Sequence, residues 1–216
     1  MDIKVPRGQG LYIINALRQM IYTQRCVLRP IAFSVGNSNV LSAGNTVVED
    51  MISFSTAISK LNYVCKGINE PEGTIIKSTH VCDSVLRTSD LVTESIDVLD
   101  LADDKEHLHT IRTDGNANAS VPVTIFYRMG CGMYTAEENL YFLKNAKGDD
   151  AHFIDNPDKY TYFSSRHVDV DKFTYSIEQL PMDDVIHVNV SVFSGQSEKE
   201  VLHEAKNALI SCMECF

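Results

Sequence analysis

The most regular hydrophobic pattern of this chain lies in GQGLYIINALRQMIY, residues 8–22. Within it, apolar side chains recur three and four residues apart, which is the spacing of one face of an α-helix. The stripe contains Ile13, Ile14, Leu17, Met20 and Ile21 and is wider than one contact buries. We therefore expect a helix over residues 10–25 that packs against two surfaces, one in its own domain and one in a second copy of the chain.

Two more helices and several strands are expected further along. The capping box Ser197-Glu198-Lys199-Glu200 opens one helix, because its serine and glutamate side chains satisfy free backbone N–H groups. Apolar residues at helical spacing follow the box, namely Val201, Leu202, Ala205, Ala208, Leu209 and Cys212. The other helix is indicated by Val47, Val48, Met51, Ile52, Ile58 and Leu61. Residues rich in β-formers predict strands within 121–127, 173–177 and 186–192, so the fold class is α+β.

Polar, turn-rich stretches at residues 36–45 and 145–159 flank a central block. We therefore predict a discontinuous lobe of residues 1–36 and 158–216, with residues 37–157 inserted into it as a second lobe.

The chain has 216 residues, with 29 Asp and Glu against 19 Lys and Arg and a net charge of −10. Because affinity for a phosphate backbone comes mainly from cationic side chains, a dominant role in gripping DNA or RNA is not expected. No apolar run approaches the roughly 20 residues that span a bilayer, and the N-terminus has no signal-peptide pattern. We expect a protein without membrane spans that stays in the compartment where it is made.

Six cysteines are scattered along the chain, mostly within apolar segments, which favours reduced thiols in the core. Cys212 and Cys215 form a C-x-x-C pair, but structural zinc needs a second ligand pair, and no βαβ context supports a redox motif. Glu106-His107-Leu108-His109 has two imidazoles on one strand face, for which a half-exposed strand edge is a simpler interpretation than a metal site. No metal or cofactor is therefore expected.

Gly130-Cys131-Gly132 lacks the third glycine and the following apolar helix of a dinucleotide loop, so we interpret it as a turn. A nucleophile formed by Cys131, with His109 or His152 as its base, stays open as an alternative. That alternative is a small cysteine-dependent hydrolase or transferase. No catalytic residue is assigned.

Residues 8–20 resemble the glycine-led "T-L-G-N-A-L-R-R" first helix of the alpha subunit of bacterial and plastid RNA polymerase. Residues 130–139, GCGMYTAEEN, are similar to the "G-R-G-Y-V-P-A-E-E-N" of that family. Residues 81–98, 162–168 and 173–178 resemble further segments of it in the same order. The resemblance covers nearly the whole chain at low overall identity.

The resemblance implies a two-lobed RNA polymerase alpha N-terminal-domain-like fold, a dimerisation lobe with an inserted β-rich lobe. It implies a non-catalytic scaffold that dimerises and docks the β-like and β′-like large subunits for transcription. The implied docking residues are Asn15, Arg18, Gln19, Tyr22, Gly130, Gly132, Glu137 and Glu138. The implied dimer residues are Ile13, Ile14, Leu17, Met20, Ile21, Leu202, Ala205 and Leu209.

The chain also departs from the family. Gln19 stands where the family has the second Arg of "L-R-R", and Thr135 stands where it has Pro, so contacts at these places should differ. No linker and small helical domain follow Phe216, so we expect DNA to be contacted only indirectly. A heterodimer with another alpha-like chain stays open beside the homodimer, and an unrelated interaction module stays open beside the polymerase subunit. The expected location is the cytoplasm (nucleoid) or the equivalent compartment of an organelle or a virus-infected cell.

Overall fold

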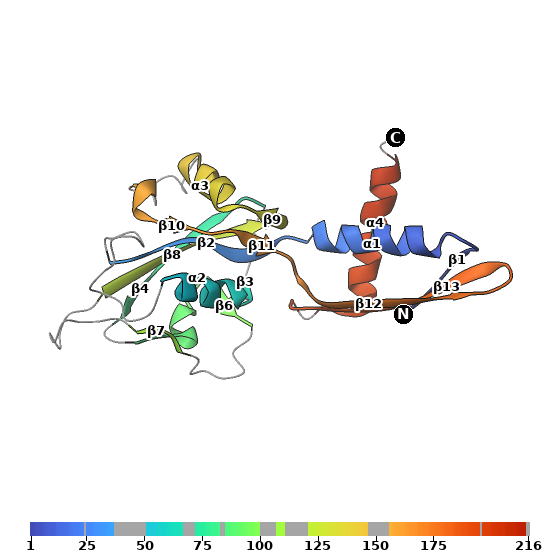
Figure 1. Cartoon of the computed structure of the whole chain (residues 1–216), viewed down its shortest axis with the longest axis horizontal. Coiled ribbons are helices and arrows are strands. Elements are labelled where there is room, and N and C mark those ends of the chain that lie inside the picture. The colour runs from blue at the N-terminus through green and yellow to red at the C-terminus, as the bar shows by residue number, and fades with distance from the viewer. Residues whose placement is uncertain are drawn as a thin grey trace. The chain divides into compact units, whose positions relative to one another are not determined.

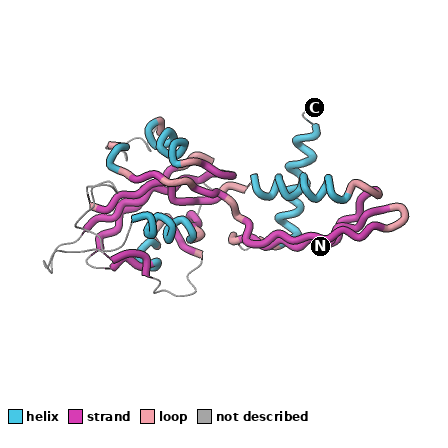
Figure 2. The backbone as a smooth tube through the Cα atoms, viewed as in Figure 1, coloured by secondary structure: helices cyan, strands magenta, loops and turns pink. Residues whose placement is uncertain are grey.

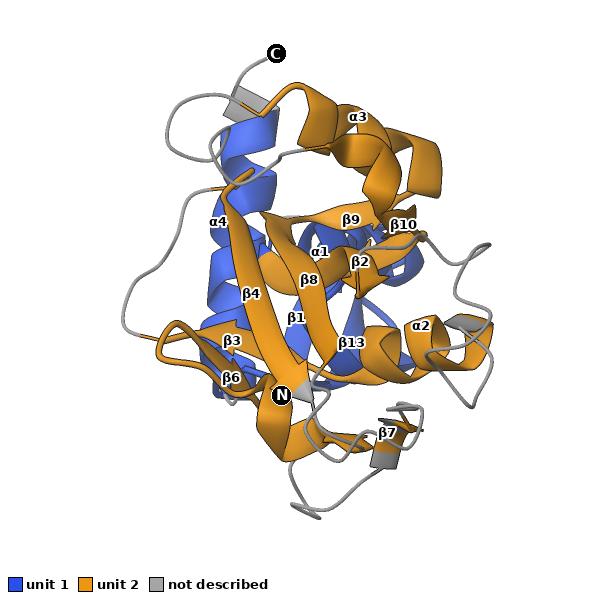
Figure 3. Ribbon diagram, turned by 90° about the vertical axis from the view of Figure 1, so that its left-hand side faces the viewer, with its two compact units in different colours: residues 1–26, 168–216 blue, residues 27–167 orange. Residues whose placement is uncertain are grey.

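The computed structural model describes residues 1–23, 25–36, 51–66, 72–82, 85–99, 107–110, 121–146, 156–194 and 196–214 (Figure 1). The chain forms two compact units (Figure 3). The first, here called the end unit, consists of residues 1–26 and 168–216, and the second, the inserted unit, is the continuous segment 27–167. Helices and strands occur in both units, so the predicted α+β class is confirmed. Within the residue ranges given above, no helix is long and apolar enough to cross a membrane.

The end unit is a three-stranded antiparallel sheet, in the order β1-β13-β12, with two helices packed on one face (Figure 1). Its elements are β1 (Asp2–Pro6), α1 (Gly10–Thr23), β12 (Val170–Gln179), β13 (Asp183–Val192) and α4 (Glu198–Glu214). On the middle strand, Ile186, Val188 and Val190 are buried, whereas His187 and Asn189 between them are exposed. This alternation is typical of an antiparallel sheet with one face on the core.

Side chains from both helices fill the core of the end unit. Ile14, Leu17 and Ile21 of α1 meet Val201 and Leu202 of α4 over the buried face of the sheet. Each fully buried Leu or Ile side chain contributes about 1.5–3 kcal/mol relative to an exposed one, so α1 is held mainly by this packing.

A carboxylate from a distant part of the chain fixes the start of α1. The backbone N–H groups of Gly8 and Gly10 donate to Asp184 Oδ2 at 2.8 and 3.0 Å. Asp184 therefore acts like an N-cap that is remote in sequence, because the Gly10 N–H is one of the donors that a helix leaves free at its first turn, and the bond from Gly8 fixes the turn before it. Gly8 has a φ of +82°, a conformation that favours glycine.

The close approach at Gly10 makes a testable prediction. A Cβ there would lie 3.1 Å from both Asp184 Oδ2 and Ile177 Cγ2, which is closer than van der Waals contact. Gly→Ala in an unconstrained helix stabilises by roughly 0.5–1 kcal/mol. We expect Gly10→Ala to destabilise instead, by about 1–3 kcal/mol, because the added methyl overpacks the site. Thermal unfolding measures the sign, and an unchanged or raised Tm would contradict the prediction.

The inserted unit is built around a six-stranded sheet with the order β4-β8-β2-β3-β6 and β10 paired to β2. These strands are β2 (Val27–Val35), β3 (Tyr63–Cys65), β4 (Ile75–Cys82), β6 (Ile96–Val98), β8 (Val121–Gly130) and β10 (Thr161–Tyr162). Two smaller antiparallel pairs join β5 (Val85–Arg87) to β7 (His107–Thr110) and β9 (Gly132–Tyr134) to β11 (Ser165–His167). The helical segments are α2 (Met51–Lys60), α3 (Ala136–Lys144) and 3-10 turns at Thr88–Leu91 and Pro157–Lys159.

Both faces of the central strands are buried, so β2 and β8 are mainly apolar, and their arginines, Arg29 and Arg128, are buried as well. On β8, Ile125 and Tyr127 join a core that contains Phe54 of α2. Phe126, which points to the other face, joins a second core that contains Leu143 of α3. The two helices therefore cover opposite faces of the sheet (Figure 2).

The unit boundaries differ from the predicted ones. Residues 27–36 and 158–167, which we assigned to the first lobe, lie in the inserted unit. The reason is main-chain pairing: β2 pairs with β8, β10 with β2, and β11 with β9. Polar composition near residues 36 and 158 therefore does not mark a change of unit.

Most helices and strands that the spacing of apolar residues predicts are confirmed. The first and third predicted helices are α1 and α4, and the Ser197 box is present, with Ser197 N donating to Glu200 Oε2 at 2.9 Å. The second predicted helix is α2, which begins at Met51, and Val47 and Val48 lie outside the described residues. The predicted strands correspond to β8, β12 and β13, whereas β1, β2, β4 and α3 were not predicted.

Candidate functional site

The residues predicted for a dimer contact fall into two groups. Ile14, Leu17, Ile21, Leu202 and Ala205 are buried in the core of the end unit. These five are core residues, which corrects their assignment to a dimer contact. The stripe of α1 is wide because the helix packs on both the sheet and α4, so its second surface lies within the same chain.

The other three residues of the predicted dimer contact lie at the margin of the end-unit core. Ile13, Met20 and Leu209 are only partly buried. Beyond them, Leu11 and Tyr12 on α1 are 52% and 77% exposed. Exposed large apolar side chains that lie together are typical of an interaction surface. The apolar surface that α1 leaves uncovered therefore lies at its first turn.

The docking residues predicted on α1 share one exposed stripe. Asn15, Arg18 and Gln19 are exposed, and Tyr22 is partly buried against the core. Their spacing of three and four residues places them along one side of the helix. Within the described residues no carboxylate forms an ion pair with Arg18, so its guanidinium faces solvent with its donors unused.

The other predicted docking residues, at 130–138, belong to the inserted unit, and there the structure gives the glycines a packing role. A Cβ at Gly130 would lie 3.0 Å from Arg128 Nη1 and from Tyr134 Cε2. The Arg128 guanidinium lies 4.5 Å from the ring centroid of Tyr134 and 3.9 Å from that of Phe142, which are cation–π contacts. Gly132 has a φ of +84°, so the turn itself favours glycine.

The two acidic residues that follow, Glu137 and Glu138, differ in their surroundings: one bonds within the fold and the other is exposed. Glu138 belongs to a capping box at the start of α3, in which Thr135 N donates to Glu138 Oε2 at 2.7 Å and Glu138 N donates to Thr135 Oγ1 at 3.2 Å. The bond from the Thr135 backbone lowers the pKa of the Glu138 carboxyl. A proline at position 135 would lack that N–H. Glu137 is exposed and, among the described residues, has no such contact.

Asn139, the last residue of the matched stretch, begins a chain of buried hydrogen bonds. Its Nδ2 donates to Phe163 O at 2.8 Å and to Ser165 Oγ at 3.0 Å. Ser165 Oγ lies 2.9 Å from His167 Nε2, and His167 Nδ1 lies 3.0 Å from Val27 O. Because a carbonyl only accepts, Nδ1 carries the proton and Nε2 accepts from the serine hydroxyl.

This arrangement requires a neutral imidazole. Burial lowers the pKa of His167 to about 4, against a raising effect of the Val27 carbonyl, and the nearby charges of Arg128 and Arg29 lower it further. The network ties α3 and β11 to the first residue of β2. The sequence does not predict this network, although Asn139 lies within residues 130–139, one of the two stretches that carry the resemblance.

Two serine–histidine pairs have the geometry of a nucleophile and its base. Ser165 Oγ lies 2.9 Å from His167 Nε2, and Ser78 Oγ lies 2.8 Å from His80 Nε2. All four side chains are buried, and burial is the main cause that lowers the pKa of both histidines. A substrate cannot reach either hydroxyl, so these pairs are interpreted as structural.

The alternative nucleophile, Cys131, is in a disulfide, so the expectation that all cysteines are reduced is wrong at this position. The candidate base His152 and the side chain of His109 lie outside the described residues. Cys212 is a free, exposed thiol, and its C-x-x-C partner Cys215 is also outside them.

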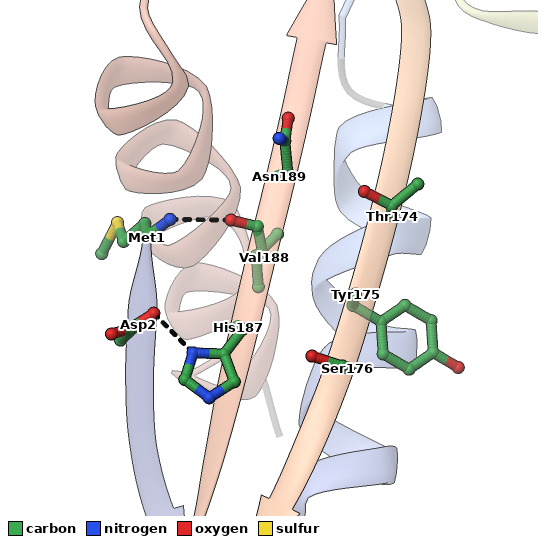
Figure 4. Close-up of a pocket in the computed structure, with 8 residues that line it drawn as sticks. All are labelled: Met1, Asp2, Thr174, Tyr175, Ser176, His187, Val188 and Asn189. Carbon is green, nitrogen blue, oxygen red and sulfur yellow. Dashed lines mark hydrogen bonds and ion pairs between the residues drawn. The ribbon is translucent and has the colours of Figure 1, made fainter.

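The uncovered face of the end-unit sheet carries a polar cluster around His187 (Figure 4). His187 Nδ1 donates to Asp2 Oδ1 at 2.8 Å, and its Nε2 lies 3.6 Å from Glu178 Oε2. The bond to Asp2 is the main cause that raises the pKa of His187. A shallow cavity of about 300 Å³ lies here, lined by Met1, Asp2, Thr174, Tyr175, Ser176, His187, Val188 and Asn189. Both ring nitrogens face carboxylates of the neighbouring strands, so the cluster ties β1 and β12 to β13.

Scanned against protein-family models and against curated proteins, the chain gives no match. The roles of its motif residues therefore rest on the contacts described above.

The shifted pKa values of His167 and His187 predict opposite dependences of folding stability on pH. His167 has a folded-state pKa below the ordinary value of 6.5, so its contribution is fully present above pH 6.5 and is lost as the pH falls toward 4. That loss is about 3 kcal/mol, since one pKa unit corresponds to about 1.4 kcal/mol. His187 has a raised pKa, so its contribution is present below pH 6.5 and is lost as the pH rises through the folded value.

Imidazole NMR resonances of the folded protein test this assignment. We expect the His187 ring to titrate above pH 6.5 and the His167 ring to stay neutral until about pH 4. Urea unfolding should show the fall in stability below pH 6.5, and His167→Gln should reduce its slope. Titration of both rings close to pH 6.5 would contradict the described surroundings.

Proposed function

We propose that the chain is a non-catalytic assembly subunit of a multisubunit DNA-dependent RNA polymerase, which pairs with an alpha-like chain and docks the two large catalytic subunits. The observation that carries the proposal is the composition of the end unit. Two segments from the two ends of the sequence share one sheet and one pair of helices, and a complete second unit is inserted between residues 26 and 168. This is the organisation that the resemblance to the alpha N-terminal domain implies.

The two stretches that carry the resemblance support the proposal through their surroundings. Gly10, in the first stretch, allows the start of α1 to approach Asp184. Asn139, in the second stretch, holds the chain that returns from the inserted unit. Each stretch thus contains a residue whose contact is required by this fold. A similar pattern in another chain therefore favours a similar architecture.

Pairing with an alpha-like chain would use the apolar surface that α1 leaves exposed. A stable contact buries about 1,200–2,000 Å² in total, and Tyr12 is the most exposed apolar residue of α1. If the partner is a second copy, Tyr12→Glu should convert a dimer into a folded monomer, because Tyr12 lies outside the core; its Tm should fall only by the stabilisation that association gave. Light scattering after gel filtration measures the mass.

The matched control is Tyr175→Glu, which places the same charge at a partly exposed tyrosine of the same unit and should leave the dimer intact. Leu17→Asp is not a suitable test, because Leu17 is buried in the core and its substitution would unfold the unit. A wild-type chain that stays monomeric at high concentration excludes the homodimer and leaves the heterodimer.

The polymerase assignment itself is tested by purifying the tagged chain from the cells that express it. We expect two much larger chains to co-purify and the complex to make RNA from a DNA template, whereas the isolated chain makes none. Truncating a charge that is buried at an interface costs roughly 2–5 kcal/mol. Arg18→Ala should therefore lower recovery of a large chain by about tenfold or more without changing the Tm, since about 1.4 kcal/mol corresponds to tenfold.

Lys172→Ala, which removes one exposed charge from β12, is the control and should recover the large chains fully. Equal recovery with Arg18→Ala would remove Arg18 from the docking surface. A tagged chain that elutes without larger chains, in fractions that make no RNA, would contradict the proposed function.

A further inference from the structure

The outer edge of β12 is an unpaired strand edge. β12 is the last strand of the end-unit sheet, next to β13. Leu180 N donates to Asp183 O at 2.8 Å at the turn between these strands, so alternate residues before Leu180 bond toward β13. The N–H and C=O groups of the residues between them, Phe173, Tyr175 and Ile177, therefore point away from the sheet. In the described part of the chain no group bonds to them on that side, and such an edge is a template for a further strand.

Helix α1 runs along this strand in the opposite direction. A Cβ on Gly10, the first residue of α1, would lie 3.1 Å from Ile177 Cγ2, so the helix begins near the end of β12. Figure 1 shows α1 running from there along the sheet toward the start of β12.

One side of α1 faces the open edge. Met20 lines a small cavity with residues of α4, so α4 flanks the opposite side of the helix. Leu11 lines a cavity together with Ile177 of β12. Arg18 follows Leu11 by seven residues, about two turns or 10 Å of helix, which equals about three residues of extended strand. Arg18 therefore lies on the side of Leu11 and near Tyr175, and its guanidinium donors face solvent.

The cavity beside Leu11 is large enough for a side chain of a partner. Its volume is about 440 Å³, and it is lined by Gly8, Leu11, Ile177, Gln179 and Asp184. Leu11 and Ile177 provide apolar walls, and nothing lies within 4 Å of the position that a Cβ of Gly8 would take. An aliphatic side chain that entered the cavity would remove apolar surface of both walls from water.

We propose that the open edge of β12 binds an extended segment of a protein partner, which adds to the sheet as an antiparallel strand. The main chain of the segment pairs with the outward groups of Phe173, Tyr175 and Ile177. On the side facing α1, an apolar side chain enters the cavity beside Leu11, and an acidic side chain two residues further along accepts from Arg18, whose planar fork suits a carboxylate. Only the identity of the partner rests on the proposed function.

The probe is the peptide STLTETVTS with blocked ends, in which the leucine would lie opposite Ile177 and the glutamate opposite Tyr175. Titrated into the ¹⁵N-labelled chain, it should cause saturable shifts of the amides of Phe173, Tyr175 and Ile177 and slow their hydrogen exchange, because their N–H groups become bonded. Absence of binding, or shifts without slower exchange on β12, would overturn the proposal.

Two modified peptides test the main-chain pairing. N-methylation of the glutamate removes the N–H that faces Tyr175 O and should weaken binding by about tenfold or more. N-methylation of the threonine after it, whose N–H points away from β12, is the matched control and should leave the affinity nearly unchanged. Equal affinities of these two peptides would overturn strand addition.

Variants of α1 test the side-chain contacts. Leu11→Glu should weaken binding by about tenfold or more, because it places a charge at the apolar wall. Tyr12→Glu makes the same charge change at the next residue, which does not line the cavity, and should bind as wild type does. Arg18→Ala should weaken binding of the peptide but not of a version with glutamine in place of glutamate. Equal affinity of Leu11→Glu and wild type, or equal effects of Arg18→Ala on both peptides, would overturn the assigned contacts.

These results are separate from the test of the proposed function. A chain that binds the peptide but co-purifies with no larger chains would contradict only the polymerase assignment. A chain that co-purifies with them but does not bind the peptide would overturn only the strand addition.

Discussion

The structure depends on how the chain leaves the end unit and returns to it. Each unit joins the two crossing segments by its own polar interaction. In the end unit, Arg25 donates to Asp169 Oδ2 through Nε at 3.0 Å and through Nη2 at 2.9 Å, and to Glu204 of α4 at 2.6 Å. In the inserted unit, His167 Nδ1 donates to Val27 O at 3.0 Å. The four residues at the crossings, 25, 27, 167 and 169, are thus held in pairs.

These polar interactions lie beside apolar packing at the same crossings. Val168 belongs to the core of the end unit and Leu28 to a core of the inserted unit, so directional bonds add to the packing that holds each crossing segment. Asp169 is 3% exposed and also accepts from Ser194 N at 2.9 Å and Ser194 Oγ at 2.7 Å, which satisfies a carboxylate that would otherwise be costly to bury. Arg25 in turn bonds to Gln196 as well as to the two acids. Removing either Arg25 or Asp169 would leave the charge of the other buried without its partner, so the ion pair stabilises the crossing only when both side chains are present.

The sequence predicts the elements better than it predicts their contacts. Helices α1 and α4 follow from spacing and capping, and β13 follows from strict alternation, because these signals are local. Whether Leu17 meets its own sheet or a second copy is not a local property, and the width of the stripe pointed to the wrong surface. Asp184 caps a helix that begins far earlier in the chain, so no short motif marks it. Helix α3 also has a local signal, the capping box from Thr135 to Glu138, although we predict no helix there.

The contacts also separate what the motifs do for the fold from what they offer to a partner. On α1, Gly10, Ile14 and Leu17 face Asp184 and the core, whereas Arg18 and Gln19 lie on the exposed side. In the second motif, Glu138 and Asn139 are used internally, and Glu137 is exposed. A replacement such as Gln for Arg at position 19 therefore changes the surface without disturbing the packing. The buried half of each motif therefore bears on architecture, and the exposed half is the part open to a partner: there Arg18 and Glu137 keep the alpha pattern, whereas Gln19 and Thr135 depart from it.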